Sequence, residues 1–285
     1  MSARPVRGTP AREALQGAIT AISAAGCETP RLDAEVLLAD VLGVGRERIL
    51  TDPSLAVAGP AVRTFQNAVR RRAVEREPVA YITGHRGFRR LELKVDHRAL
   101  IPRPETELLV EVALGLPSGS TVLDLCTGSG AVALAVKDER SDLEVRGSEI
   151  SEPALALARE NGERLGLDVG WLSADLLEGL PDDFDAVLAN PPYVADGERS
   201  AMAPEILRHE PPGALFAGPD GLDVIRPLLD QIAGRSRVLL VAIEVGAGQA
   251  EHVGELVARA GFGTVRLEAD LAGIKRVVIG EREAR

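Results

Sequence analysis

Residues 121–130 read TVLDLCTGSG, and this stretch indicates the class of fold. Its first half is an apolar run typical of a buried strand, and its second half is a turn of small residues before a helical segment. Small residues let the backbone approach a ligand closely, and the free N–H groups of a helix N-terminus attract an anionic group. The turn lacks the third glycine of the dinucleotide fingerprint and the Gly-Lys-Ser/Thr of the phosphate-binding loop. The pattern therefore disfavours nicotinamide and ATP as ligands.

Apolar strands and amphipathic helices alternate on both sides of this turn. The candidate strands are Thr121–Leu125, Leu143–Ser148, Val169–Ser173, Phe184–Ala189, Val238–Glu244, Phe262–Glu268 and Ile274–Ile279. A helix is expected over Ser151–Leu165, with serine at the cap position and Gly166 beyond the end. This alternation predicts an α/β fold with a doubly wound, mostly parallel seven-stranded sheet that binds ligands at the carboxyl ends of its strands. The Pro- and Gly-rich loop 196–219 is a candidate part of a substrate site.

The first eighty residues contain helical patterns only. Helices are expected from Thr9-Pro10 to Gly26, from Pro30 to Gly43, over Arg46–Leu50 and over about Pro60–Glu75. Between Tyr81 and Ile101 the apolar residues begin to alternate with polar ones, which predicts a β-hairpin. We therefore expect a helical bundle at 1–80, a hairpin linker at 81–104 and a catalytic domain at 105–285.

Charge is distributed unevenly along the chain. Residues 1–100 hold 16 Lys and Arg against 11 Asp and Glu, whereas residues 101–285 hold 17 against 32. The large acidic part argues against stable, non-specific nucleic-acid binding, which depends on neutralising many phosphates. The basic part is open to two interpretations: contact with nucleic acid or an acidic protein, or a solvated helix face. Its arginines include Arg63, Arg70, Arg71, Arg72 and Arg76.

We expect a cytoplasmic protein. The longest apolar run, Val238–Ile243, is far short of the ~18 residues that span a bilayer. Charged and proline residues stand where an export signal needs an apolar stretch, and the two cysteines are then expected to be reduced. The charged and proline residues are Arg4, Pro5 and Arg7, and the cysteines are Cys27 and Cys126.

Glu149 ends the second candidate strand, roughly 20 residues after the glycine turn. An acid at this position can accept hydrogen bonds from the two ribose hydroxyls of a nucleoside. Together with the glycine turn, it favours an adenosine-containing cofactor. Asp175 follows the third strand, where it can either reach the adenine edge or cap a helix.

The sequence Asn190-Pro191-Pro192-Tyr193 directly follows the strand Phe184–Ala189. The two prolines fix the backbone and remove two N–H donors, so that nearby carbonyls can face a substrate. The Asn190 side-chain oxygen and a neighbouring carbonyl suit a planar NH₂ group, and Tyr193 can stack on its flat face. This motif is the most specific chemical signal in the chain.

These motifs resemble the S-adenosylmethionine-dependent methyltransferases that act on planar nitrogens. The resemblance is closest to the protein-(glutamine-N5) methyltransferase family called HemK or PrmC, and it extends from about Glu77 to Gly280. It is carried further by EPVAYITG at 77–84, LIPRPETE at 100–107, the segment from Glu210-Pro211 to Gly221-Leu222, and DLAG at 270–273. Two positions depart from the family pattern, which usually has Gly in place of Cys126 and Asp in place of Glu149.

The resemblance implies a class I, Rossmann-like methyltransferase that modifies the glutamine of the Gly-Gly-Gln loop in peptide chain release factors. It implies no metal. The cofactor S-adenosylmethionine would contact Cys126, Thr127, Gly128, Ser129, Gly130, Glu149, Asp175, Leu176 and Asn190. Substrate binding and catalysis would involve Asn190, Pro191, Pro192 and Tyr193, with Arg103 and Glu105 near the mouth of the site. In this scheme Asn190 and the Pro191 carbonyl accept the two amide N–H groups.

Three other functions stay open from the sequence. The same amide chemistry suits the glutamine of a large-subunit ribosomal protein. An Asn-Pro-Pro-Tyr motif also serves the exocyclic amino group of adenine in nucleic acid. A non-catalytic nucleoside-binding module is the third. We expect the N-terminal bundle to recognise the protein substrate.

Overall fold

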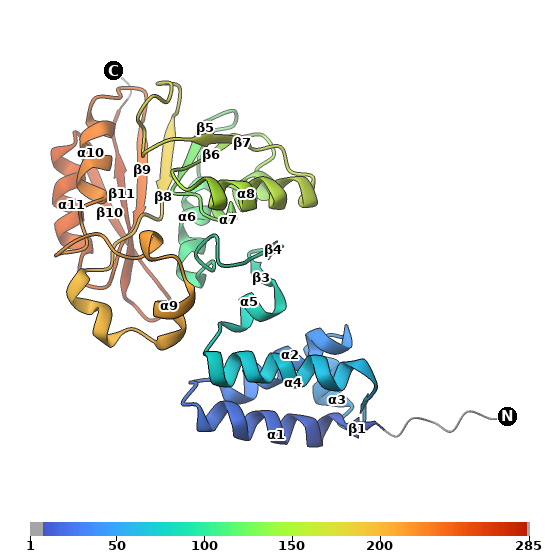
Figure 1. Cartoon of the computed structure of the whole chain (residues 1–285). Coiled ribbons are helices and arrows are strands. Elements are labelled where there is room, and N and C mark those ends of the chain that lie inside the picture. Colours follow the sequence, from blue (N-terminus) through green and yellow to red (C-terminus); the bar gives the residue numbers. More distant parts are fainter. Residues whose placement is uncertain (1–7, 284–285) are drawn as a thin grey trace. The chain divides into compact units, whose positions relative to one another are not determined.

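The computed structural model describes residues 8–283, so the expectation for Arg4, Pro5 and Arg7 lies outside it. Figure 1 shows the chain. It divides into two compact units. The helical unit comprises the residues up to Gly84 together with 203–209, and the sheet unit comprises 85–202 and 210 onward. Within residues 8–283, no helix is both long and apolar enough to cross a membrane.

The helical unit consists of short helices. They are α1 Ala11–Ala24, α2 Pro30–Leu42, α3 Arg46–Thr51, α4 Pro60–Arg70, α5 Val79–Thr83 and α9 Pro204–His209. Strands β1 Thr9–Pro10 and β2 Ala56–Val57 pair antiparallel. The four expected helices are confirmed, although α1 starts one residue late because Pro10 is in β1. The fourth ends in a π-helical turn at Arg71–Glu75. Helix α5 has five residues, too few for a helical period to show in the sequence.

Helix α9 joins the bundle through buried ion pairs. Arg72 is 6% exposed and donates to Asp33 at 2.6 Å and to Glu205 of α9 at 2.9 Å. Arg76 donates to the other Glu205 oxygen at 2.7 Å, and the His209 ring nitrogen lies 2.8 Å from the Glu75 carbonyl. The solvated-face interpretation is therefore wrong for Arg72, whose charge is neutralised within the bundle.

The sheet unit contains the predicted seven-stranded sheet, in the order β10-β11-β9-β8-β5-β6-β7. The strands are β5 Thr121–Leu125, β6 Glu144–Glu149, β7 Gly170–Ser173, β8 Ala186–Ala189, β9 Leu240–Glu244, β10 Thr264–Ala269 and β11 Lys275–Glu281. All neighbours are parallel except β11, which pairs antiparallel with β9 and β10. The expected hairpin is present as β3 His85–Phe88 and β4 Leu91–Lys94.

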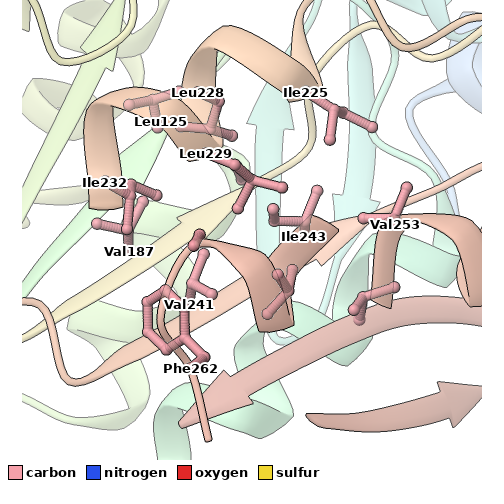
Figure 2. Packing of buried hydrophobic residues seen from close by; sticks show 14 of the residues in the cluster. Leu125, Val187, Ile225, Leu228, Leu229, Ile232, Val241, Ile243, Val253 and Phe262 are labelled. Carbon is pink, nitrogen blue, oxygen red and sulfur yellow. The ribbon is translucent and has the colours of Figure 1, made fainter. Parts of the chain in front are cut away.

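Helices cover both faces of this sheet. Helices α6, α7 and α8 lie on one face, and α10 and α11 lie on the other (Figure 1). Their bounds are α6 Glu107–Leu114, α7 Ala131–Glu139, α8 Glu152–Leu165, α10 Ile225–Ala233 and α11 Ala250–Arg259. In the core, aliphatic side chains of α10 and α11 pack on those of β5, β8 and β9 (Figure 2). The fold is thus the doubly wound α/β sheet that the sequence predicts.

The sheet order creates a crevice beside β5. The chain goes from β5 to β6 and β7 on one side, then returns to β8 and β9 on the other. The connections that leave β5 and β8 therefore diverge, and ligands of doubly wound sheets bind at such a switch point. Cys126 directly follows β5 and Asn190 directly follows β8, so both stand at this crevice.

Candidate active site

A cavity of about 510 Å³ occupies the crevice within the sheet unit. Most of the predicted site residues line it: Cys126, Thr127, Gly128, Ser129, Glu149, Asp175, Leu176, Asn190, Pro192 and Arg103. Four others, Gly130, Pro191, Tyr193 and Glu105, are outside its lining. The structure therefore brings all the expected cofactor residues except Gly130 to a single cavity.

A buried acid that sequence reasoning did not assign holds the glycine turn. Asp124 is 2% exposed and accepts hydrogen bonds from the Thr127 hydroxyl at 2.5 Å and the Ala133 amide at 3.0 Å. Burial raises the pKa of Asp124 to about 7, against the lowering effect of these two bonds. The carboxyl group thus ties the turn to the first residues of α7. The available signal was a charged residue inside an otherwise uncharged central strand.

Gly130, the last residue of the turn, lies against the single tryptophan of the chain. Its φ is +83°, and a Cβ atom there would lie 2.9 Å from Cη2 of Trp171, which comes from β7. Gly147 on β6 faces the same ring, since its Cβ would lie 2.5 Å from Cζ3. Both positions therefore require glycine because the indole fills the space of a side chain.

We expect Gly130→Ala to lower the free energy of unfolding by about 2–4 kcal/mol, combining left-handed backbone strain with overpacking. Gly166→Ala is the matched control, because its φ is +66° and a Cβ atom at this position would have no neighbour within 4 Å. That variant should lose only about 1 kcal/mol from strain. Urea unfolding measures both, and equal losses would show that Trp171 does not constrain the turn.

Cys126 adopts a left-handed conformation with φ +60°, which explains why glycine suits this position in the family pattern. Burial, with the nearby Glu149, Asp124 and Asp175 carboxylates, raises the pKa of its thiol well above the usual value. Burial also raises the pKa of Cys27. Both cysteines are free, and the raised pKa of each thiol favours its protonated, less reactive form.

At pH 8 we expect iodoacetamide to alkylate Cys126 at least ~10-fold more slowly in the native protein than in urea, because only the thiolate reacts. Mass spectrometry of timed samples measures each site, and Cys126→Ser isolates the contribution of Cys27. Native alkylation of Cys126 at the unfolded rate would contradict the neutral-thiol assignment.

Glu149 connects the glycine turn with the start of α8. Its Oε2 accepts from the Gly128 amide and its Oε1 from the Ser151 amide, each at 3.0 Å. A carboxylate oxygen has two lone pairs, so each oxygen keeps one acceptor site for a ligand hydroxyl. The longer glutamate side chain thereby fixes the turn as well as offering acceptors.

An apolar surface flanks this carboxylate. Ile150 lines the cavity and is 64% exposed, although sequence reasoning did not assign it. Leu176 lines the cavity with φ +51°, next to the exposed Asp175. An exposed isoleucine and a half-buried leucine beside an acid suit a ligand that joins a flat ring to a polyhydroxylated group.

The Asn190 side chain is held by a residue from a distant part of the chain. Asn190 Nδ2 donates to the Thr106 hydroxyl at 3.1 Å. Because the amide nitrogen is engaged there, the Oδ1 atom is left to accept from a substrate. Pro191 is buried, and Pro192 lines the cavity beside Asn190.

Tyr193 donates its hydroxyl proton to Glu244 Oε1 at 3.2 Å, at the end of β9. Burial and the neighbouring Glu244 raise the pKa of Tyr193 above its usual range, so the hydroxyl stays a donor. The tyrosine packs against the core behind the cavity lining, and the proposed stacking on a substrate stays a prediction.

Arg103 lines the cavity and pairs with a buried acid. Its Nη2 atom lies 2.5 Å from Glu210 Oε1, while Glu210 Oε2 accepts from the Ile101 amide at 3.3 Å. Glu210 is 4% exposed, so it holds the 101–103 segment at the cavity wall. The family resemblance points to the Glu210-Pro211 pair without assigning it a role.

Comparisons with known proteins show the family of the chain. Residues 13–84 match the family model of the PrmC N-terminal domain, and residues 104–218 match that of the methyltransferase small domain. A release factor glutamine methyltransferase from Caulobacter vibrioides is 40% identical over 90% of this chain and 91% of its own length. Another, from Mycolicibacterium smegmatis, is 38% identical over 96% of this chain and 98% of its own length.

Solved structures support the fold. A methyltransferase from Pyrococcus furiosus superposes with a TM-score of 0.51 at 17% identity, covering 67% of this chain and 88% of that one. The catalytic domain of hMettl16, solved with a 3′UTR hairpin, superposes with a TM-score of 0.55 at 12% identity, covering 81% of this chain and 83% of that one. The match in sequence over nearly the whole length of curated relatives decides the family: the chain belongs to the HemK/PrmC family of release factor glutamine methyltransferases.

Proposed function

We propose that this enzyme transfers a methyl group from S-adenosylmethionine to the side-chain amide nitrogen of the glutamine in the Gly-Gly-Gln loop of peptide chain release factors. The observation that carries the proposal is the orientation of Asn190. Its amide nitrogen donates a hydrogen bond to the Thr106 hydroxyl, so its oxygen is available at the cavity. Relatives named for this activity support the choice of substrate.

The residues at the cavity fit S-adenosylmethionine by their chemistry. Glu149 offers acceptors for a ribose diol, and Ile150 and Leu176 offer apolar surface for an adenine ring. The buried Ser148 hydroxyl, which has no hydrogen-bond partner among the described residues, also lines the cavity. When bound, the cofactor supplies a methyl group on a positively charged sulfur, which leaves as a neutral thioether.

The protein must compensate for a weak nucleophile, because the lone pair of an amide nitrogen is delocalised. Asn190 Oδ1 and the Pro191 carbonyl accept the two amide N–H bonds and hold the nitrogen toward the methyl donor. Positioning of this kind, together with acceptors that stabilise the developing positive charge, lowers the barrier. The nitrogen gains the methyl group and then releases one proton to solvent.

We propose the helical unit as the site that recognises the protein substrate, since none of the predicted cofactor or catalytic residues lies in it and residues 1–84 hold 11 arginines against 9 Asp and Glu, opposite in sign to the acidic part beyond residue 100. We further propose a cytoplasmic location, where a translation factor is available and both cysteines remain free. The acidic composition beyond residue 100 supports the expectation of no stable nucleic-acid complex.

The test is methyl transfer from labelled S-adenosylmethionine to a panel of acceptors. The panel holds a purified release factor, its Gln→Ala variant in the Gly-Gly-Gln loop, a short peptide of that loop, the large-subunit ribosomal protein and duplex DNA. We expect label on the unmodified release factor, with a higher KM for the peptide if the helical unit recognises the folded protein. Label on the ribosomal protein or DNA alone would refute the proposed substrate.

A further inference from the structure

The Asn-Pro-Pro-Tyr loop contains two residues that cannot donate a backbone hydrogen bond. Pro191 and Pro192 lack an N–H group, so neither can attach the loop to its surroundings through a backbone donor. Proline also fixes φ, so these two residues make the loop stiff. A shift of Tyr193 at one end is therefore transmitted to Asn190 at the other end instead of being absorbed between them.

The carbonyl group of Tyr193 is held by a side chain from a distant part of the sheet unit. Gln249, a half-buried residue directly before α11, donates from Nε2 to the Tyr193 carbonyl at 3.0 Å. The same nitrogen donates to the Asp220 carbonyl at 3.3 Å, and Gln249 Oε1 accepts from the Gly246 amide at 2.8 Å. One side chain thus joins the loop after β8, the segment around Asp220 and the turn between β9 and α11.

The three partners fix the orientation of the Gln249 amide. The two carbonyl groups can only accept, and the backbone N–H of Gly246 can only donate. Nε2 must therefore face the carbonyls and Oε1 the backbone amide, a choice that the nearly symmetrical shape of the amide alone leaves open. A glutamate at this position could accept from Gly246 but could donate to neither carbonyl when ionised.

Neighbouring glycines enclose this hydrogen bond. Gly221 has φ +76°, and a Cβ atom there would lie 2.2 Å from the Tyr193 carbonyl oxygen and 2.7 Å from Gln249 Nε2. A Cβ atom on Gly246 would lie 3.3 Å from Cδ2 of the Tyr193 ring. The ring hydroxyl donates to Glu244 at 3.2 Å. Tyr193 is therefore confined on its ring side by Glu244 and Gly246, and on its main-chain side by Gln249 and Gly221.

We propose that Gln249 is a positioning residue that sets the place of the Asn-Pro-Pro-Tyr loop by holding the Tyr193 carbonyl. Through the two stiff prolines, this bond determines where the Asn190 oxygen and the Pro191 carbonyl stand relative to the substrate nitrogen. Gln249 is outside the cavity lining, so it acts through the loop and not on a ligand. The inference rests on the proposed function, since the position of the loop affects turnover only if the loop holds the substrate amide.

The test compares Gln249→Met and Gln249→Glu with wild type on the unmodified release factor. Methionine has a similar length without an N–H donor, and glutamate keeps only the acceptor for Gly246. Because a misplacement of about 1 Å can cost ~10²-fold in rate, we expect kcat to fall at least ~10-fold in both, with the Kd for S-adenosylmethionine unchanged. Glutamate should be the poorer variant, since its charge would face two carbonyl oxygens.

Thermal unfolding separates positioning from a purely structural role. Val194 keeps its backbone bonds to Leu215 and Ala217 in either variant, so the fold does not depend on the Gln249 amide alone. We expect Gln249→Met to unfold cooperatively and to be fully folded at the assay temperature. A lower Tm combined with wild-type kcat would make Gln249 a structural residue only and would overturn the proposal.

Gln231→Glu is the matched control. Gln231 is a half-buried residue of α10, and its Oε1 accepts from the Leu177 amide at 2.8 Å. Glutamate can accept the same bond, so this variant should keep the kcat and Kd of wild type. An equal loss in Gln231→Glu, together with wild-type kcat in Gln249→Met, would assign the effect to added negative charge and contradict the positioning role.

A second readout reports on the hydrogen bond itself and needs no turnover. The chain has two tyrosines, Tyr81 and Tyr193, so tyrosine labelled with ¹³C at the carbonyl carbon gives two NMR signals. A hydrogen bond deshields the carbonyl carbon that accepts it. Gln249→Met should therefore move the Tyr193 signal upfield and leave that of Tyr81, in the helical unit, in place. An unmoved Tyr193 signal would overturn the proposal.

Wild-type methylation in the same assay distinguishes the two levels of the account. If wild type does not methylate the release factor, the proposed function fails, whatever the carbonyl signal of Tyr193 does. If wild type methylates the release factor and Gln249→Met matches its kcat, the proposed function stands and the positioning role of Gln249 is wrong.

Discussion

Asn190→Ala lowers turnover on the release factor by ~10²-fold or more, with affinity for S-adenosylmethionine retained. The variant removes the oxygen that accepts one substrate N–H bond in the proposed mechanism. The loss should appear in kcat, because the interaction strengthens as positive charge develops on the nitrogen. Calorimetric titration of the cofactor and a release-factor turnover assay on the same sample measure the two effects separately.

Asn190→Asp is the informative companion to the alanine variant. It keeps an oxygen for the substrate but cannot donate to the Thr106 hydroxyl as Nδ2 does. We expect its kcat to lie between those of wild type and Asn190→Ala. An alanine variant that methylates normally would remove Asn190 from the mechanism, whatever the aspartate variant does.

Glu149→Ala weakens S-adenosylmethionine binding by about 100-fold, with a much smaller effect on kcat at saturating cofactor. The change removes an ionised acceptor for two ribose hydroxyls, and hydrogen bonds to a charged group each contribute about 1.5–3 kcal/mol. It also leaves the Gly128 and Ser151 amides without their present acceptor. Isothermal titration calorimetry gives the affinity, and turnover at increasing cofactor concentration gives kcat.

Two further variants control this result. Glu149→Asp keeps the carboxylate and should bind within about tenfold of wild type, a difference of about 1.4 kcal/mol. Glu152→Ala removes an exposed acid three positions later, whose side chain is 63% exposed, and should bind the cofactor normally. Normal binding by Glu149→Ala itself would place the ribose elsewhere in the cavity.

The sheet was predictable because its strands are apolar and regularly interrupted. Every expected strand is present, with ends that shift by one or two residues where a strand leaves the sheet, as at Phe184 and Ala186. The cavity residues followed from the same pattern, since the carboxyl ends of β5, β6 and β8 meet at one edge of the sheet.

Other features depend on contacts that no local pattern records. The docking of α9 in the helical unit rests on ion pairs from Glu205 to Arg72 and Arg76, more than a hundred residues away in sequence. Glu244 was visible only as the acid that ends an apolar strand. Its link to Tyr193 requires the order β9-β8 in three dimensions. The same holds for Thr106, which reaches Asn190 from before α6.

The most direct test of the central claim is to locate the methyl group. The release factor is incubated with S-adenosylmethionine and either wild-type enzyme or Asn190→Ala, then digested and sequenced by tandem mass spectrometry. We predict a single added methyl group on the glutamine of the Gly-Gly-Gln loop with wild type, and at least ~10²-fold less with the variant. A methyl group on any other residue, or equal modification by both proteins, would contradict the account.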